Sequence, residues 1–398
     1  MPKSSKFPIF LLPMIALNQV LKLLTPFELI ALSLCSKSSK QKCKSVRTQA
    51  QCDNNSENFE LKYSSETKWI RMTFKSFPSM SWYFRINRYP KKKTRMRRLF
   101  SAVFCNKRYT EVVKGLHVPT FVSKRGKIRG MTVNSLSMFT SNEFISTTRN
   151  LVLYLEDLFN IPLSKVAIDI SKLEREEIFK VTDTFCNDET KPLREFVSQA
   201  GEDQQEIDKE LLESIIKRQN AMIGIELDFN PLPGFTWDLN RIENKPSLLK
   251  IEHSHWINVE QLIELNFEHV ILERSAFLKE DIIIFLRTWI LGFKFKWRCV
   301  QIIFKEIVDI DLCVLEMLDQ NTIEGLEVFN YADTHNVTYR RFKELDEFKG
   351  TNRKIGYSFY QHDDSAITIW IKKNNALIYN RMGGDHDVLH ETCIFRDF

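Results

Sequence analysis

Residues 12–24 read LPMIALNQVLKLL, and this stretch decides how the chain begins. Its apolar side chains at positions 17, 20, 21 and 24 follow the spacing i, i+3, i+4, i+7, which places them on one face of a helix. Asn18, Gln19 and Lys22 form a narrow polar stripe opposite that face. The stretch therefore predicts an amphipathic helix that needs something to pack against.

Residues 25–37, TPFELIALSLCSK, predict a second helix directly after the first. Thr25 supplies the N-cap, Pro26 the first helical position and Glu28 the third residue of a capping box. This helix is apolar on more than one side, and a short third helix is expected from Lys37 before a polar linker. Since fewer than about fifty residues rarely bury so much apolar surface alone, another domain or another protein should cover the rest.

The order of these pieces resembles an F-box, over residues 7–47. The resemblance rests on Leu12-Pro13, on the first helix, on the pattern Leu24-x-Pro26-x-Glu28-Leu29 and on LSLCSK at residues 32–37. It implies a three-helix motif that docks onto a Skp-type adaptor within a cullin–RING ubiquitin ligase. The adaptor contacts that it implies are Leu12, Pro13, Leu17, Val20, Leu21, Leu24, Pro26, Leu29, Leu32 and Cys35.

Two other interpretations compete for the same residues. A secretory signal also combines a basic start with an apolar run, here residues 7–17, but Pro8 and Pro13 interrupt the run and no small-residue cleavage site follows it. The second alternative is an ordinary helical hairpin packed within a larger core.

Composition bounds the rest of the chain. Its 398 residues, 43% of them hydrophobic and 30 of them Phe, suit two or three folded domains with a large core. No run of eighteen apolar residues occurs, so we expect no transmembrane span and no membrane partner. None of the eight cysteines forms a Cys-x-x-Cys pair, and several lie in apolar runs, which favours reduced core cysteines and a cytoplasmic and/or nuclear location.

The net charge of +6 is concentrated at the N-terminus. Residues 1–50 hold eight Lys or Arg and one acid, so the remaining residues hold 49 of the 57 basic and 50 of the 51 acidic side chains. An argument from overall charge for nucleic-acid binding by the whole protein therefore fails.

We divide the chain into four segments: the F-box at 1–50, a linker and β-rich segment at 51–149, a strand–helix array at 150–330 and a C-terminal β segment at 331–398. The fold class expected is a mixture of α+β and α/β, with a three-helix F-box, a small β-rich segment and an irregular leucine-rich-repeat-like array. Alternation of large apolar and polar residues predicts a small antiparallel sheet in the second segment. Its strands are expected at 69–74, 81–86, 121–122 and 131–133.

The array begins with a predicted helix at 151–159 and a strand at 166–170, and the acidic residues 169–213 are expected to form exposed helices and a loop. Strands then recur about every 20–31 residues, a spacing typical of leucine-rich-type solenoids, and right-handed crossovers should make them parallel. We expect strands at 223–227, 248–251, 269–272 and 300–304, and helices at 259–265, 279–291 and 310–318.

The array carries a second resemblance. Residues 267–275, 278–282 and 285–292, together with AITIWI at 366–371, resemble the type-2 F-box-associated domain of the nematode-expanded F-box families. The likeness spans residues 150–398. It implies that this part of the chain binds a target protein.

Motifs for catalysis are missing from the sequence, which has no phosphate loop, dinucleotide fingerprint or nucleophile elbow. His386 and His390, with Asp385 and Asp387, have metal-like spacing but are expected to be a solvated tail. His253 and His255 are expected to be an exposed or hydrogen-bonded pair. We therefore expect no catalytic residue, no cofactor and no metal.

The sequence thus favours a non-catalytic, substrate-recognition subunit of an SCF-type E3 ubiquitin ligase, with a Skp-type adaptor and an unknown target protein as partners. The alternative is a nucleic-acid-binding or scaffolding protein that uses a basic cluster at residues 91–98, although nucleic acid is the less favoured partner and a solvated loop is the simpler explanation. The cluster consists of Lys91, Lys92, Lys93, Arg95, Arg97 and Arg98.

Overall fold

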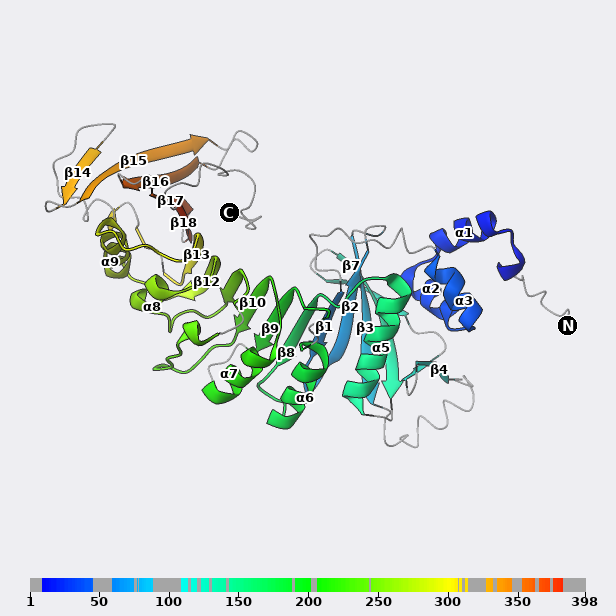
Figure 1. The fold of residues 1–398 in the computed structure, drawn as a ribbon. Helices are drawn as coiled ribbons and strands as arrows, with labels where there is room; N and C mark the ends of the chain where they lie inside the picture. Colours follow the sequence, from blue (N-terminus) through cyan, green and yellow to red (C-terminus); the bar gives the residue numbers. More distant parts are fainter. Residues whose placement is uncertain are drawn as a thin grey trace. The chain divides into compact units, whose positions relative to one another are not determined.

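The structure, a computed structural model, divides into two compact units (Figure 1). Unit 1 comprises residues 1–194 and unit 2 residues 195–398, so the division falls inside the segment 150–330 that the sequence pattern groups together. The structure describes residues 9–45, 59–74, 77, 79–88, 109–113, 116–119, 123–128, 131–140, 143–187, 190–201, 206–242, 245–306, 308–309, 312–313, 327–331, 335–345, 353–361, 365–372 and 375–381.

Unit 1 begins with the three predicted helices, α1 (Met14–Leu23), α2 (Pro26–Ser33) and α3 (Lys37–Lys44), after a short 3-10 helix, η1 (Ile9–Leu11). The capping box is present, because the Glu28 amide donates to Thr25 Oγ1 and the Thr25 amide donates to Glu28 Oε2. Ser36 caps α3 in the same way by accepting from the Ser39 amide. The starts of α2 and α3 are thus fixed by local polar groups that the sequence displays, whereas α1 follows Pro13 and has no side-chain cap.

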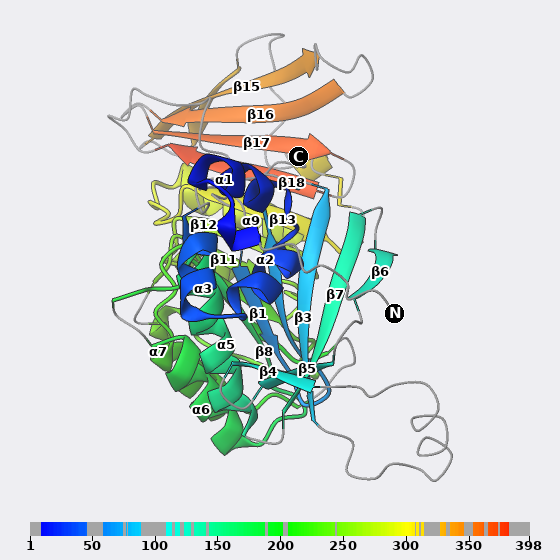
Figure 2. The same cartoon turned by 90° about the vertical axis from the view of Figure 1, so that its right-hand side faces the viewer.

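The sheet of unit 1 is mixed, so the prediction of a purely antiparallel sheet is wrong. Strands β1, β2 and β3 pair antiparallel, whereas β3 pairs parallel with β7 and β1 pairs parallel with β8. Long connections through residues 89–130 and through the helix after β7 return the chain in the same direction, which a tight hairpin cannot do. The strands, several of which lie side by side in Figure 2, are β1 (Phe59–Tyr63), β2 (Lys68–Thr73), β3 (Met80–Arg88), β4 (Tyr109–Val113), β5 (Leu116–Pro119), β6 (Ser123–Ile128), β7 (Met131–Thr140) and β8 (Lys165–Asp169).

One face of this sheet is covered by helices α5 (Phe144–Phe159) and α6 (Arg175–Phe185). Phe74, just after β2, packs edge-on against Phe159 of α5, and the Tyr63 hydroxyl of β1 donates to a carboxylate of α6. Helix α5 begins seven residues earlier than predicted, because its polar first turns contain threonines that are buried rather than solvated, among them Thr147 and Thr148.

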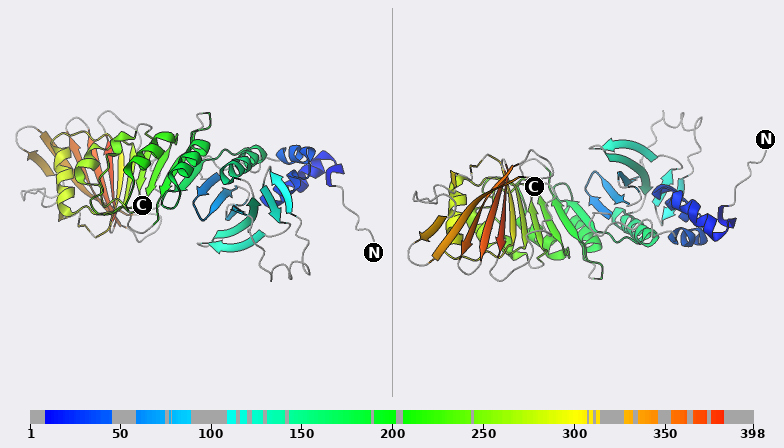
Figure 3. Two further views of the ribbon diagram at one scale, coloured as in Figure 1. Left: turned by 90° about the horizontal axis from the view of Figure 1, so that it is seen from below. Right: turned by 90° about the horizontal axis from the view of Figure 1, so that it is seen from above.

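Unit 2 contains five parallel strands in chain order, β9 to β13, as the predicted crossovers require (Figure 3). Four of them were expected from the apolar runs, but β9 lies in the acidic region predicted to be exposed helices and loop. The strands are β9 (Glu195–Gln199), β10 (Gly224–Asp228), β11 (Leu248–Ile251), β12 (His269–Ser275) and β13 (Cys299–Phe304), and the helices between them are α7 (Lys209–Arg218), η3 (Leu239–Arg241), α8 (Val259–Glu264) and α9 (Lys279–Ile290).

The C-terminal strands extend the same sheet antiparallel. The last strand, β18, pairs with β13, and the chain order then runs backwards through β17, β16 and β15 to β14. The strand that resembled the family's terminal strand, β17, therefore lies between β16 and β18 inside the sheet. The bounds are β14 (Glu327–Tyr331), β15 (His335–Leu345), β16 (Arg353–Gln361), β17 (Ala366–Lys372) and β18 (Asn375–Arg381).

The core of unit 2 contains an aromatic stack of Phe285, Phe295 and Trp297, whose ring centroids lie 4.7–5.8 Å apart with interplanar angles of 14–17°. The indole N–H of Trp297 donates to the carbonyl of Leu262 at 3.1 Å. The side-chain amide of Asn380 in β18 donates to the carbonyls of Phe295 and Trp297. The stack therefore joins α9, the loop before β13 and the C-terminal strands.

Several predicted features lie outside the described residues: the strand at 121–122, the basic cluster at 91–98, the histidines at 386 and 390 and most of the helix at 310–318. None of the described helices is both long and apolar enough to span a bilayer. Four of the five cysteines in the described part of the chain are buried, and burial raises the pKa of Cys43 to about 11.

Candidate functional site

Large apolar side chains are exposed along the outer side of η1 and α1. Leu11, Ile15 and Leu23 are each about four-fifths exposed, at 81%, 80% and 82%, and Met14 is 57% exposed. Ile15 and Leu23 are two steps of four residues apart within α1, which keeps them towards one side of that helix, and Leu11 ends η1 just before it. We call these four residues the N-terminal apolar surface. Exposed apolar side chains gathered in this way make the segment a candidate protein–protein interaction site.

The opposite side of α1 forms the core of the three-helix module. Leu17 and Leu21 are 1% and 0% exposed, so in the free chain they support the N-terminal apolar surface and do not form part of it. Pro26 is also buried. Of the other predicted adaptor contacts, Pro13 and Cys35 are exposed, and those of intermediate exposure are Leu12, Val20, Leu24, Leu29 and Leu32.

Sequence reasoning therefore missed Leu11, Met14, Ile15 and Leu23. Their signal was present, because these positions also follow helical spacing, but α1 is apolar on two sides. The pattern alone does not say which of two apolar sides packs inward. Adaptor binding by the predicted set as a whole stays a prediction.

Helices α2 and α3 fasten the module to the rest of unit 1, which leaves α1 turned away from these contacts (Figure 1). Phe27 packs edge-on against Trp82 and Phe84 of β3, with ring centroids 4.8 and 5.3 Å apart. The hydroxyls of Ser33 in α2 and Tyr154 in α5 share a hydrogen bond. Apolar and polar contacts thus hold α2 on both β3 and α5.

Helix α3 adds ionic contacts to α5. Lys40 and Lys44 both form ion pairs with Asp157, and the Lys40 ammonium lies 4.2 Å above the ring centre of Tyr154. Burial tends to raise the pKa of Asp157, but hydrogen bonds from the two lysines outweigh burial and hold that pKa below its ordinary value. The carboxylate is therefore ionised at neutral pH and available to both lysines.

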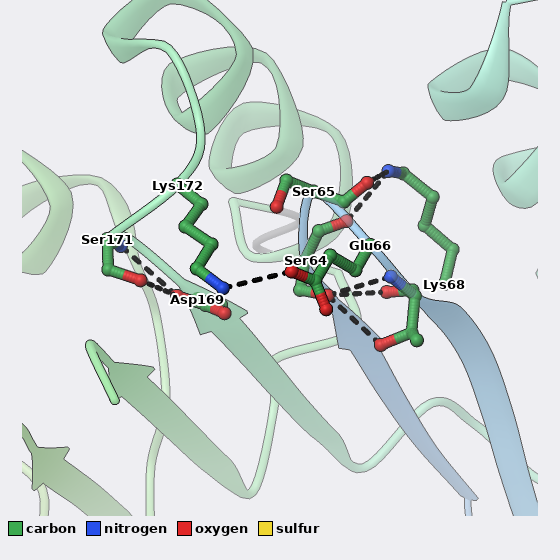
Figure 4. A network of polar contacts seen from close by, with 8 residues as sticks. Ser64, Ser65, Glu66, Lys68, Asp169, Ser171 and Lys172 are labelled. Atoms are coloured by element: carbon green, nitrogen blue, oxygen red, sulfur yellow. Dashed lines mark hydrogen bonds and ion pairs between the residues drawn. The ribbon is translucent and has the colours of Figure 1, made fainter. Parts of the chain in front are cut away.

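A second polar cluster surrounds the turn between β1 and β2 (Figure 4). The Lys68 ammonium donates to the carbonyls of Ser64 and Ser65 at 2.7 and 3.1 Å. It also lies over the rings of Tyr63 and Phe144. Burial lowers the pKa of Lys68. Because its donors are directed at backbone carbonyls of the turn, this lysine stabilises the turn and holds no reacting group in place.

A third cluster lies on the strands of unit 2. The Lys250 ammonium forms ion pairs with Glu226 at 2.9 Å, Glu252 at 3.1 Å and Glu273 at 3.2 Å, and all four side chains are about one-quarter exposed. Burial raises the pKa of Glu273, Lys250 lowers it and Glu252 raises it again, so that it remains above the ordinary value. One cation therefore holds three carboxylates together across β10, β11 and β12.

Replacing this cation by Lys250→Met is expected to destabilise unit 2 by about 2 kcal/mol at pH 8 and by less at pH 5. Without Lys250 the pKa of Glu273 rises further in the folded state, whereas in the unfolded chain it stays near 4.3. In the variant, the raised pKa of Glu273 stabilises the folded state at low pH, where this carboxyl is protonated. That stabilisation is lost as the pH rises through the pKa of the folded state, so the variant is less stable at pH 8 than at pH 5. Denaturant unfolding at both pH values measures the difference.

The matched control is Lys296→Met, which removes an exposed ammonium from the loop before β13 and is expected to change stability equally little at both pH values. An equal loss for Lys250→Met at pH 5 and pH 8 would contradict the role assigned to the lysine.

Catalytic and metal-binding candidates gain no support within the described residues. No group of three or more His, Cys, Asp or Glu in this part of the chain has a metal-binding arrangement. His253 is buried and lies within hydrogen-bonding distance of Arg274, whose guanidinium is 2.9 Å from His253 Nε2. This contact agrees with the expected hydrogen-bonded histidine.

Comparison with protein families identifies two regions. Residues 9–49 match the family model described as the F-box domain, and these residues contain η1 and α1 to α3. Residues 241–302 match the model described as F-box associated, which contains β11, α8, β12 and α9 and reaches into β13. No curated protein and no solved structure matches the chain.

Proposed function

Because the chain combines an F-box domain with an F-box-associated domain, an arrangement typical of non-catalytic adaptor proteins, we propose that it is the substrate-recognition subunit of an SCF-type E3 ubiquitin ligase. Its partners are a Skp-type adaptor, through it a cullin–RING ligase, and a target protein. The chain itself supplies no catalytic residue. The observation that carries the proposal is the N-terminal apolar surface, which lies within the F-box match.

Adaptor binding requires an apolar surface that remains accessible when the chain is folded. Ile15 and Leu23 meet this requirement, because each is four-fifths exposed while the helix that bears them is anchored from its other side by Leu17 and Leu21. Fully burying one such side chain is worth about 1.5–3 kcal/mol. A few of these contacts suffice for a stable complex.

We assign target binding to the C-terminal part of the chain, residues 150–398. This part contains the predicted irregular leucine-rich-repeat-like array. The sequential parallel strands β9 to β13 support this assignment. The chemical effect of the protein is proximity: a target held beside a ubiquitin-charged enzyme presents its lysines at a high effective concentration. This role would place the protein in the cytoplasm and/or nucleus, where buried thiols such as those of Cys43 and Cys186 stay reduced.

The test is co-expression of the full-length chain with a Skp-type adaptor, followed by size-exclusion chromatography and calorimetry. We expect a stoichiometric complex with a dissociation constant below about 1 μM. The control is the adaptor with a folded protein that has no F-box. If the folded full-length chain elutes separately from the adaptor, the proposal is wrong.

A further inference from the structure

The sheet of unit 1 has a second face, opposite the one that α2, α5 and α6 cover. Side chains alternate along each strand, so residues that pair in register across neighbouring strands share a face. On β3, Trp82 and Phe84 pack against Phe27 of α2, whereas Tyr83 and Arg85 point to the other side. We call that side the basic–aromatic face.

Two rows of paired residues make up this face. Four of their ten residues are basic and only Glu60 is acidic, so the two rows together carry a net charge of +3. Glu60 is already engaged by Arg71, whose guanidinium lies 2.9 Å from its carboxylate. The first row is Lys165, Glu60, Arg71, Tyr83 and Ser135, and the second is Ala167, Lys62, Trp69, Arg85 and Ser137.

Aromatic rings alternate with guanidinium groups at the centre of the face. Trp69 pairs in register with Arg85, and Arg71 pairs with Tyr83. The rings of Trp69 and Tyr83 lie 5.2 Å apart at 63°, and both residues are partly exposed, while Arg85 is exposed. Trp69 and Tyr83 thus lie among cations on the accessible part of this face, which β2 and β3 form, whereas Glu60 of β1 and Ala167 of β8 are buried.

We propose that the basic–aromatic face binds single-stranded nucleic acid. Bases stack on aromatic rings and on guanidinium planes, and the surrounding ammonium and guanidinium groups neutralise phosphates. Trp, Tyr and Arg also recur in protein–protein interfaces, so an acidic protein segment is the competing occupant. The alternation of rings and guanidinium groups favours a single strand, in which bases alternate with phosphates. This binding is independent of the adaptor role, because none of these residues belongs to the N-terminal apolar surface.

The probe is a fluorescein-labelled single strand of about twelve nucleotides, either oligo(U) or oligo(dT), titrated with the full-length chain at about 50 mM and 200 mM salt. We expect salt-sensitive binding, which fluorescence anisotropy measures. Tighter binding of one of the two strands identifies RNA or DNA as the ligand. No binding of either strand at low salt would overturn the proposal.

Removing both rings by Trp69→Leu with Tyr83→Leu is expected to weaken binding at least about tenfold with little change in salt dependence. Removing two charges by Lys62→Gln with Arg85→Gln should reduce the slope of log affinity against log salt by about two. The matched control, Lys172→Gln with Lys180→Gln, removes two exposed ammonium groups of unit 1 from outside the face and should leave the affinity unchanged. Circular dichroism verifies that the variants fold. The single variant Arg85→Gln, at an exposed position, should still reduce the slope of log affinity against log salt by about one.

Two results would assign the binding elsewhere and overturn the proposal. In the first, polyglutamate competes as well as unlabelled oligo(U) and the ring variant binds like the wild type, so that the face recognises acidic protein by charge alone. In the second, neutralising Lys91, Lys92 and Lys93 abolishes binding while the ring variant retains it, so that the basic cluster at 91–98 is responsible.

Discussion

The double variant Ile15→Asp with Leu23→Asp is expected to lose at least about 100-fold in affinity for the Skp-type adaptor while its thermal stability stays unchanged. Each side chain contributes about 1.5–3 kcal/mol if buried in the complex, and each aspartate adds the cost of desolvating an unpaired charge. Since about 1.4 kcal/mol corresponds to a tenfold change in affinity, the expected loss is conservative. In the free chain both positions are in water, so folding is not affected.

The matched comparison is Leu17→Asp with Leu21→Asp on the inner side of the same helix. Both leucines are buried, and burying a carboxylate there should unfold the three-helix module, so that binding is lost together with helicity. Circular dichroism and calorimetry separate the two variants. If the Ile15 and Leu23 variant binds the adaptor like the wild type, the N-terminal apolar surface is not the docking site.

Trp297→Ala is expected to destabilise unit 2 by about 4 kcal/mol, the largest stability loss of a single substitution considered for that unit. The change leaves a cavity in the aromatic stack with Phe285 and Phe295, and it removes the indole N–H that donates to the Leu262 carbonyl. Because the chain has two units, one of its thermal transitions should shift downwards and the other should not.

Differential scanning calorimetry measures that shift. The control is Leu291→Ala, which shortens an apolar side chain that is 58% exposed at the end of α9 and is expected to cost less than about 0.5 kcal/mol. Equal losses for the two variants would show that the stack does not hold the C-terminal strands to the rest of the unit.

Much of the fold could be predicted from residues whose effect is local. Thr25 and Glu28 define the start of α2, and strands β2, β3, β11 and β12 follow from alternation or from short apolar runs. Features that depend on distant partners could not. Strand β9 is flanked by acidic residues and is a strand because β10 pairs with it, and the parallel pairing of β3 with β7 depends on where a long connection ends.

The candidate site shows the same limit at the level of one helix. Sequence periodicity correctly indicates that α1 is amphipathic, and the F-box match confirms the recognised motif. Yet Leu17 and Ile15 are equally apolar residues two positions apart, and only the packing of α3 and α2 beneath α1 decides that Leu17 is buried and Ile15 is exposed. Hydrophobicity alone does not tell which of the two residues is buried.

The anchoring of α2 and α3 also determines where the chain can be divided. Cutting after residue 49 would uncover Phe27 on one fragment and Trp82 and Phe84 on the other, besides leaving Asp157 without its two lysines. Both fragments would then present freshly exposed aromatic surface and aggregate. We therefore expect residues 1–194, the first compact unit, to be a better fragment for testing adaptor binding than the F-box alone.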